Sequence, residues 1–208
     1  MNPQISNNNY FIMRHGQALF NARNIIDSHG DESNHLTEIG IGEIRESISK
    51  FKKQNPKIDL IIHSPFIRTT ETANFSAELL GVDKANVIAN PLIKEIDTGI
   101  FHKKDPKIYH DYFSSLEEKF TKTPPEGENL SDLKKRMMQF MEETESQYKN
   151  KTILIISHEY PLWILDTALM GLDNHQSAEK KLQQKDDDYI HTAEIRKLTF
   201  ERLPANVI

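Results

Sequence analysis

The sequence predicts an α/β fold with a largely parallel central sheet, and two patterns support this prediction. Short, β-branched apolar runs alternate with longer stretches whose apolar residues recur at helical spacing. The strongest apolar runs are residues 10–13, 58–63 and 152–156, and a helical pattern follows each of them. Strands that alternate with helices in this way are typical of a sheet whose strands run in the same direction and are covered by the helices.

The individual elements follow in order from this periodicity. Strands are predicted at residues 10–13, 58–63, 87–89, 152–156 and 195–200. Helices are predicted at about residues 38–54, 65–80, 106–119, 132–148 and 161–170. The charged run 179–188 is interpreted as a solvated helix or loop. We expect one domain over residues 10–203, between a flexible polar leader at 1–9 and a tail at 204–208.

Capping and helix-breaking residues indicate where the helices begin and end. Thr37 is placed to cap the first helix, and Asn55-Pro56 should end it. Ser64-Pro65 is typical of an N-cap followed by proline at the first helical position. Gly81 is predicted to end the same helix as a left-handed residue after the last turn. Ser131 is the predicted N-cap of the long helix near the middle of the chain.

Composition limits the class of protein. The 208 residues include no cysteine, which excludes disulfides, thiolate nucleophiles and cysteine-ligated zinc, and which fits a reducing, cytoplasmic location. No run approaches the ~20 apolar residues that a membrane-spanning helix needs, so we expect no membrane partner. The formal net charge of -5 argues against nucleic acid as the main partner, because a phosphate backbone favours a basic surface.

Three of the predicted strands end in a polar cluster. The clusters are Arg14-His15-Gly16, His63-Ser64-Pro65 and Ser157-His158-Glu159. Ligands of parallel α/β sheets bind beyond the carboxyl ends of the strands, so these clusters, together with Arg68, should meet in one pocket. Guanidinium groups bind phosphate oxygens through paired hydrogen bonds, and helix N-termini favour anions. The sequence therefore predicts a phosphoryl-binding site in an otherwise acidic protein.

A histidine in such a pocket could act as a nucleophile. Neutral imidazole can attack phosphorus when one ring nitrogen is free and the other donates to a fixed acceptor, which gives a phosphohistidine. Arginines would stabilise charge on the equatorial oxygens, and a carboxylic acid would protonate the leaving alkoxide and then activate water. Since the arginines supply the positive charge, the site implies no metal and no cofactor.

Five segments of the chain together resemble the histidine phosphatase superfamily, in particular its phosphatase-type branch. In order they are RHGQALFN, HLTEIGIGEI, SPFIRTTETA, PPEGENLSDLKKR and SHEYPLWIL. The resemblance implies a three-layer α/β/α sandwich of the phosphoglycerate mutase-like type. It implies His15 as the phosphorylated nucleophile. The implied substrate-binding residues are Arg14, Arg68, His158, Asn21 and Gly16, whose missing side chain would let the backbone approach the ligand.

The resemblance leaves two candidates for the proton donor. The family's acid lies in a segment similar to PLIKEIDTGIF, which points to Glu95. The common form of the last motif has glycine after the histidine, whereas this chain has Glu159. A distant branch, the phytase and acid phosphatase group, uses an acid just after that histidine as its donor. Glu159 is therefore a second candidate, with a role in substrate binding as the other possibility.

Three functions remain open at this point. The mutases of the family resemble one another in the sequence ERHYG at the acid and in a longer insertion after it. This chain reads EIDTG, and residues 101–125 are short for that insertion. Our hypothesis is therefore a phosphomonoester phosphatase that acts on a small phosphorylated substrate. The alternatives are phosphoglycerate mutase-type transfer and a non-catalytic phospho-ligand binding domain, which could be part of a longer protein.

Substrate choice has no readable motif. It should depend on residues 97–125 and 175–190, and the lysines at 103, 104 and 107 are interpreted mainly as solvated surface charge. The histidines outside the motifs are predicted to be non-catalytic. His63 is interpreted as a structural residue, and those at 29, 35, 102, 110, 175 and 191 as surface or loop residues. The sequence makes no prediction of oligomeric state.

Overall fold

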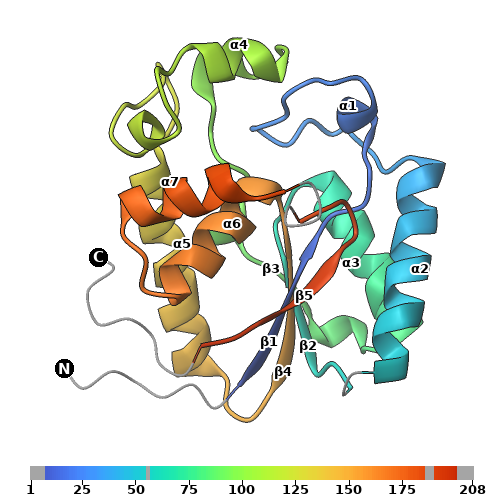
Figure 1. The fold of residues 1–208 in the computed structure, drawn as a ribbon. Coiled ribbons are helices and arrows are strands. Elements are labelled where there is room, and N and C mark those ends of the chain that lie inside the picture. Colours follow the sequence, from blue (N-terminus) through green and yellow to red (C-terminus); the bar gives the residue numbers. More distant parts are fainter. Residues whose placement is uncertain (1–7, 55–56, 186–189, 201–208) are drawn as a thin grey trace.

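The computed structural model describes residues 8–54, 57–185 and 190–200. Most of the expected leader, the whole expected tail, the Asn55-Pro56 helix stop and the end of the charged run 179–188 lie outside these residues. Within them, a five-stranded sheet forms the centre of the molecule (Figure 1). Its strands are β1 (Asn9–Arg14), β2 (Leu60–His63), β3 (Val87–Ala89), β4 (Thr152–Ser157) and β5 (Ile195–Leu198).

The strand order is β3-β2-β4-β1-β5, and every neighbouring pair is parallel except β1 and β5. The predicted, largely parallel sheet is therefore confirmed. Strand β4 lies between β1 and β2, with Arg14 opposite Ser157 and His63 opposite Ile156. This register brings the three polar clusters to the same edge of the sheet, although they are far apart in the sequence.

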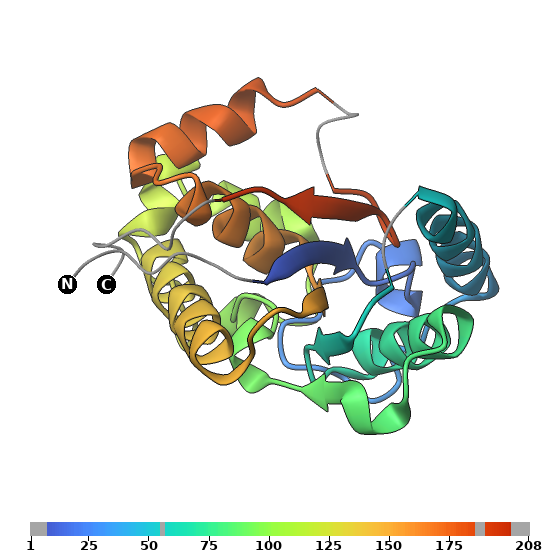
Figure 2. The same cartoon turned by 90° about the horizontal axis from the view of Figure 1, so that it is seen from below.

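Helices cover both faces of the sheet (Figure 2). They are α1 (Leu19–Ala22), α2 (Glu38–Gln54), α3 (Ile67–Leu80), α4 (Pro106–Asp111), α5 (Leu130–Gln147), α6 (Glu159–Leu169) and α7 (Asn174–Gln183). Short 3-10 turns lie at η1 (Lys84–Asn86), η2 (Pro91–Ile93), η3 (Gly99–Phe101) and η4 (Glu117–Phe120). No helix in the described part of the chain is both long and apolar enough to cross a membrane.

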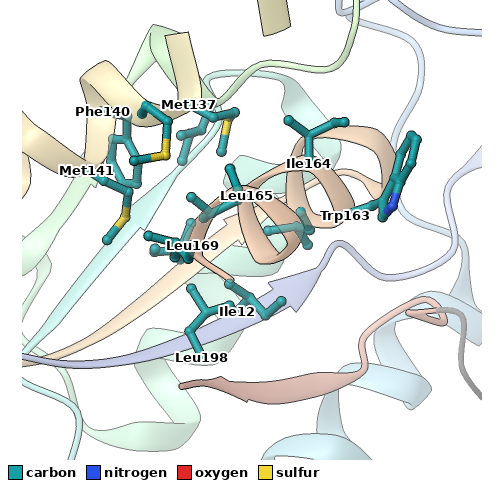
Figure 3. Close-up of a cluster of buried hydrophobic side chains, with 14 of the residues drawn as sticks. Ile12, Met137, Phe140, Met141, Trp163, Ile164, Leu165, Leu169 and Leu198 are labelled. Atoms are coloured by element: carbon teal, nitrogen blue, oxygen red, sulfur yellow. The ribbon is translucent and has the colours of Figure 1, made fainter. Parts of the chain in front are cut away.

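The alternation of side chains along the strands divides the core into two halves. Ile12 of β1 packs toward α5 and α6 with Met137, Phe140 and Leu165 (Figure 3). Its neighbours in β1 point to the other face, where they meet α2 and α3; this second cluster includes Phe11, Met13, Ile44, Ile48, Ala73 and Ala77. Because successive strand residues face opposite sides, one short apolar run can support both helical layers. The result is the expected three-layer arrangement.

Two predicted N-caps are wrong, and each serine has another partner. Helix α3 begins at Ile67 rather than at Pro65, because the backbone N–H of Ser64 still bonds Ile156 of β4. Helix α5 is capped by Asn129, whose side chain accepts from the backbone of Asp132. The Ser131 hydroxyl instead donates to the carbonyl of Phe120 at 2.7 Å. The Ser64 hydroxyl lies 2.8 Å from Nε2 of His158, so in both cases a tertiary contact takes the hydroxyl that the local sequence assigns to a cap.

Other boundaries differ more modestly from the prediction. The helix expected over 106–119 is broken into α4 and η4, and α6 begins at Glu159 rather than near residue 161. The predicted ends at Thr37 and Gly81 are confirmed. Thr37 Oγ1 accepts from the N–H of Gly40 at 3.1 Å, and Gly81 has the left-handed φ of 73° that glycine adopts readily.

Candidate active site

A cavity of about 200 Å³ lies at the carboxyl ends of the parallel strands. Six of the eight residues predicted for the site line it, namely Arg14, His15, Asn21, Arg68, Glu95 and Glu159. The other two, Gly16 and His158, are not in its wall. The described residues include no cluster of three or more histidine or carboxylate side chains that could hold a metal ion.

His15, at the end of β1, is buried and has both ring nitrogens engaged. Its Nδ1 lies 2.7 Å from the carbonyl oxygen of Gly16, which can only accept, so Nδ1 carries a proton. Nε2 is then the nitrogen with a lone pair, and it accepts from Nε of Arg68 at 3.2 Å. Burial, followed by the charges of Arg68 and Arg14, holds the pKa of His15 well below its usual value. The ring is therefore neutral near pH 7, with Nε2 unprotonated.

Arg68 is held in place by Asp27, a residue that no sequence pattern had indicated. Nη1 of Arg68 contacts Oδ2 of Asp27 at 2.5 Å, and Nη2 donates to the Asp27 carbonyl at 2.9 Å. Both side chains are almost completely buried. Arg14 has a different partner, since its Nη1 lies 3.2 Å from Oε2 of Glu159. The two guanidinium groups at the cavity are therefore held by different carboxylates, that of Arg14 by Glu159 and that of Arg68 by Asp27.

His158 lies directly against His15, with 5.1 Å between the ring centroids. It is fully buried, and its Nε2 lies 2.8 Å from the Ser64 hydroxyl. Its Nδ1 is buried and has no hydrogen-bond partner among the described residues. Burial and the nearby charge of Arg68 lower the pKa of His158 well below its usual value. A neutral ring that accepts from Ser64 at Nε2 would keep its proton on the unpartnered Nδ1.

Asn21 and Gly16 differ in their relation to the cavity. Asn21 lines it, and its Oδ1 accepts from the N–H of Ala18 at 3.0 Å, which fixes the orientation of the amide. Gly16 packs against helix α2. A Cβ at residue 16 would lie 2.7 Å from the carbonyl oxygen of Gly40. The packing of α2 is therefore sufficient to require a glycine there, whether or not its backbone also approaches a ligand.

The two candidate proton donors have opposite electrostatic surroundings. Burial raises the pKa of Glu95 to about 7, although the N–H of Ile96 donates to its carboxylate. Burial alone would also raise the pKa of Glu159, but the charges of Arg14 and Lys181 outweigh it and hold that pKa below its usual value. Near neutral pH, Glu95 can therefore hold a proton, whereas Glu159 is an ionised ion-pair partner.

The segment that carries Glu95 is fixed by Arg136 of α5. This guanidinium donates to the carbonyl oxygens of Leu92, Lys94 and Glu95 at 2.6, 2.8 and 3.1 Å. It also pairs with Glu128, whose carboxylate accepts from the N–H of Asp97. Glu128 and Arg136 both belong to the segment PPEGENLSDLKKR. This motif therefore does not line the cavity; its side chains hold the backbone of the segment that carries Glu95.

Sequence reasoning missed several residues of the cavity wall, notably Asp27, Tyr109, His110 and Tyr160. His110 was predicted to be a surface or loop residue. It is exposed, but it lies on α4 with its ring on the cavity wall. These residues come from a loop, a short helix and the first turn of α6, where periodicity carries little information. For His63 the structural interpretation fits, since the ring is buried, Nδ1 lies 2.8 Å from the Ser64 carbonyl, and His63 is not in the cavity wall.

The fold and the site together have the features expected of a phosphoryl-binding protein. A neutral histidine, two arginines and a protonatable carboxyl group meet at the strand ends of a parallel sheet. The chain belongs to the histidine phosphatase superfamily (branch 1), whose family model matches residues 10–200. The resemblance of the five sequence segments and the fold predicted from it are thereby confirmed.

Named relatives include both mutases and phosphatases. A probable phosphoglycerate mutase, GpmB of Yersinia pestis, is 28% identical over 182 residues, which is 83% of this chain and 79% of the relative. A mycobacterial glucosyl-3-phosphoglycerate phosphatase has a TM-score of 0.74 at 19% identity, over 92% of each chain. A phosphoserine phosphatase from Entamoeba histolytica has a TM-score of 0.69 at 20% identity, over 97% of this chain and 100% of its own. These structures show the shared fold, and the family supports an enzyme of phosphatase or mutase type.

Proposed function

We propose that this protein is a phosphomonoester phosphatase that works through a phosphohistidine on His15. The observation that carries the proposal is the state of that ring. Its Nδ1 proton is fixed by the Gly16 carbonyl, and its Nε2 faces Arg68 at 3.2 Å in the cavity that also holds Glu95. A neutral imidazole whose Nδ1 keeps the proton and whose Nε2 keeps the lone pair is the form that can attack phosphorus once the hydrogen bond from Arg68 is released.

In the first step, the substrate phosphoryl group would bind between Arg14 and Arg68. The Nε–H of Arg68 would then turn from His15 to a phosphate oxygen and release the nitrogen lone pair. Nε2 of His15 forms a bond to phosphorus while the bond from phosphorus to the leaving oxygen breaks. Glu95, protonated near neutral pH, gives its proton to that oxygen, and the alcohol leaves.

In the second step, the Glu95 carboxylate would take a proton from water as the water oxygen attacks phosphorus. The bond between phosphorus and Nε2 breaks, the electron pair returns to the ring, and orthophosphate is released. His158, whose ring centroid lies 5.1 Å from that of His15, would support the nucleophile from behind the cavity wall. Asn21 would contribute a further contact through its side-chain amide.

The positive charge that this chemistry needs would come from the two arginines. We therefore expect turnover without an added metal ion, and activity should survive dialysis against EDTA. A cytoplasmic location is part of the same proposal, because the chain has no cysteine and needs no oxidising compartment to fold. Loss of activity on chelation, restored by a divalent ion, would contradict the proposed role of the arginines.

Phosphoglycerate mutase-type transfer is the second candidate, because GpmB is named as a probable mutase. Two observations favour hydrolysis. The sequence EIDTG replaces the mutase-like pattern at the acid, and similar folds include phosphatases for glucosyl-3-phosphoglycerate and phosphoserine. Phosphorus NMR with 3-phosphoglycerate and a bisphosphoglycerate primer separates the two functions. We expect orthophosphate, whereas efficient formation of 2-phosphoglycerate without orthophosphate would establish a mutase.

Trapping of the intermediate tests the role of His15. The parent protein, mixed briefly with a ³²P-labelled aryl phosphate, should acquire a label that survives alkali and is lost in acid, as expected for a phosphoramidate. His15→Ala should acquire none and should lose turnover, whereas His175→Ala, at an exposed position on α7, should behave like the parent. Equal turnover by His15→Ala and the parent would exclude His15 as the nucleophile. A parent with no turnover of any phosphomonoester would favour a phospho-ligand binding domain.

A further inference from the structure

A buried lysine with no carboxylate partner lies beside the cavity. Lys119, in η4, is only 3% exposed. Its ammonium lies over the rings of Tyr109, Phe113 and Tyr160, at 4.5, 5.2 and 5.4 Å from their centroids. Within the described part of the chain, no carboxylate forms an ion pair with it. Burial lowers the pKa of Lys119 to about 8, so the side chain is still mainly charged at neutral pH.

Both hydrogen bonds of this ammonium lead to the cavity wall. Nζ of Lys119 lies 2.8 Å from Nδ1 of His110 and 3.0 Å from the hydroxyl of Tyr160. His110 and Tyr160 line the same cavity as His15. An ammonium group can only donate, so Nδ1 of His110 must accept, and the ring proton must be on Nε2. Lys119 therefore fixes His110 as an N–H donor on the wall, and no described residue takes that N–H.

The position of His110 suits the part of a substrate that lies away from the phosphoryl group. His110, Glu159 and Tyr160 line both the cavity of His15 and a second cavity of about 470 Å³. They therefore lie between the two cavities, on the side of the His15 cavity where a leaving group could extend. Of these three residues, Glu159 carries a negative charge, and it is already paired with Arg14 and Lys181.

The cost of burying Lys119 suggests a missing partner. A buried charge without a counter-ion destabilises a protein, and aromatic rings offset only part of that cost. An anion that accepts from Nε2 of His110 would be stabilised by the donor itself and by the ammonium charge behind it. The same anion would act on Lys119 at closer range than Glu159, whose charge also raises the pKa of the lysine but forms no ion pair with it in the described structure.

We propose that Lys119, His110 and Tyr160 form a subsite for a second acidic group on the substrate, either a carboxylate or a second phosphate. The preferred substrates would then be phosphomonoesters that carry another acid on the leaving group. This inference rests on the proposed function for the binding of the phosphoryl end. His110 would contact the acid, and Lys119 would be a positioning residue that acts through the His110 ring.

Binding of phosphonates, which are not hydrolysed, tests the subsite by calorimetry. The ligands are 3-phosphonopropanoate, propane-1,3-diyl bisphosphonate and propylphosphonate, which share a short chain and differ in the second group. The parent should bind at least one acid-bearing ligand about tenfold or more tightly than propylphosphonate, the size of a charged hydrogen bond. Which of the two binds more tightly distinguishes a carboxylate subsite from a phosphate subsite.

Variants then assign the preference to residues. Lys119→Met should abolish the preference and leave the affinity for propylphosphonate unchanged, and Lys119→Arg should keep part of it. Lys122→Met is the matched control, because Lys122 also lies over an aromatic ring, that of Tyr112, but pairs with Glu118 and is not in the wall of either cavity. If Lys119→Met does not fold, His110→Ala, at an exposed position, should lose the same preference.

Two results would overturn the subsite: equal affinities for all three ligands in the parent, or a preference that survives both Lys119→Met and His110→Ala. These outcomes are separate from those of the proposed function. A protein that prefers the acid-bearing phosphonates but hydrolyses no phosphomonoester keeps the subsite and loses the proposed phosphatase activity. A protein that hydrolyses phosphomonoesters without any preference keeps the activity and loses the subsite.

Discussion

Asp27 and Arg68 form a buried ion pair that holds one guanidinium group against the proposed nucleophile. Oδ2 of Asp27 contacts Nη1 of Arg68 at 2.5 Å, and the two side chains are 2% and 4% exposed. Oδ1 of Asp27 accepts from the backbone N–H groups of Gly30 and Asp31 at 2.9 and 3.0 Å. One carboxylate therefore fixes both the arginine and the loop that carries the carboxylate.

Removal of the Asp27 carboxylate should destabilise the protein strongly. Asp27→Ala leaves Arg68 buried without a counter-ion, a change that typically costs about 3–5 kcal/mol. Urea denaturation followed by circular dichroism measures the loss. Asp31→Ala is the matched control in the same loop, because Asp31 pairs with Lys103 near the surface and should matter much less. Similar losses in the two variants would show that the ion pair with Arg68 contributes little.

Ionisation of Glu95 should make kcat/KM decrease on the alkaline side of its pH profile, which we call the alkaline limb. A proton donor must be protonated, and burial raises the pKa of Glu95 to about 7. Thus kcat/KM for an alkyl phosphate should fall as the pH rises through about 7. Below that pH Glu95 stays protonated, so its ionisation should not lower kcat/KM there. Glu95→Gln should remove the limb and reduce the rate by about 10²–10⁴-fold. Steady-state kinetics from pH 5 to 9 measure both effects.

Glu159→Gln is the control for that experiment. Glu159 is ionised near neutral pH, and its charge contributes to the raised pKa of Glu95. Glu159→Gln should therefore keep the alkaline limb. The limb should move to slightly lower pH, because loss of the Glu159 charge lowers the pKa of Glu95. Loss of the limb in Glu159→Gln, with the limb intact in Glu95→Gln, would identify Glu159 as the donor instead.

Arg136 should affect catalysis without touching the substrate. It holds the carbonyl groups of Leu92, Lys94 and Glu95, and a lysine cannot reproduce that set of hydrogen bonds. We expect Arg136→Lys to lower kcat for alkyl phosphates by about tenfold or more, because small displacements of a catalytic group are costly.

Substrates with good leaving groups provide the specific readout for Arg136. Nitrophenyl phosphate needs little proton donation, so Arg136→Lys should affect its hydrolysis much less than that of alkyl phosphates. Lys135→Met, an exposed neighbour on α5, should leave both substrates unaffected. An equal loss on both substrates would indicate a general structural defect rather than a displaced Glu95.

The sheet and the meeting of its polar clusters were predictable because they depend on local pattern and one general rule. Apolar runs such as 152–156 identify buried strands, and parallel strands bring their carboxyl ends together. This placed Arg14 and His15 near Arg68 and His158. The capping role assigned to Ser64 failed, because its backbone stays bonded to β4 and its hydroxyl contacts His158 across 94 positions of sequence.

The choice of proton donor and the supporting residues required the structure. Glu95 and Glu159 differ in burial and in neighbouring charge, and neither property is readable from a sequence motif. Asp27 and His110 lie in a loop and a short helix, where periodicity gives no signal, and Asp27 meets Arg68 across 41 positions. The role of Lys119 depends on three rings that pack around its ammonium only in the folded chain.

Gly40 and Gly42 lie on the same helix, α2, and should respond to alanine in opposite directions. A Cβ at residue 40 would lie 2.2 Å from the backbone oxygen of Gln17, so α2 would have to move away from the segment that follows His15. Gly40→Ala should therefore cost about 1–3 kcal/mol and lower kcat. A Cβ at residue 42 meets nothing within 4 Å, and Gly42→Ala should add about 0.5–1 kcal/mol because alanine favours a helix interior. Urea denaturation of both variants checks the pair, and equal stabilities would mean that α2 does not pack closely on the backbone beside His15.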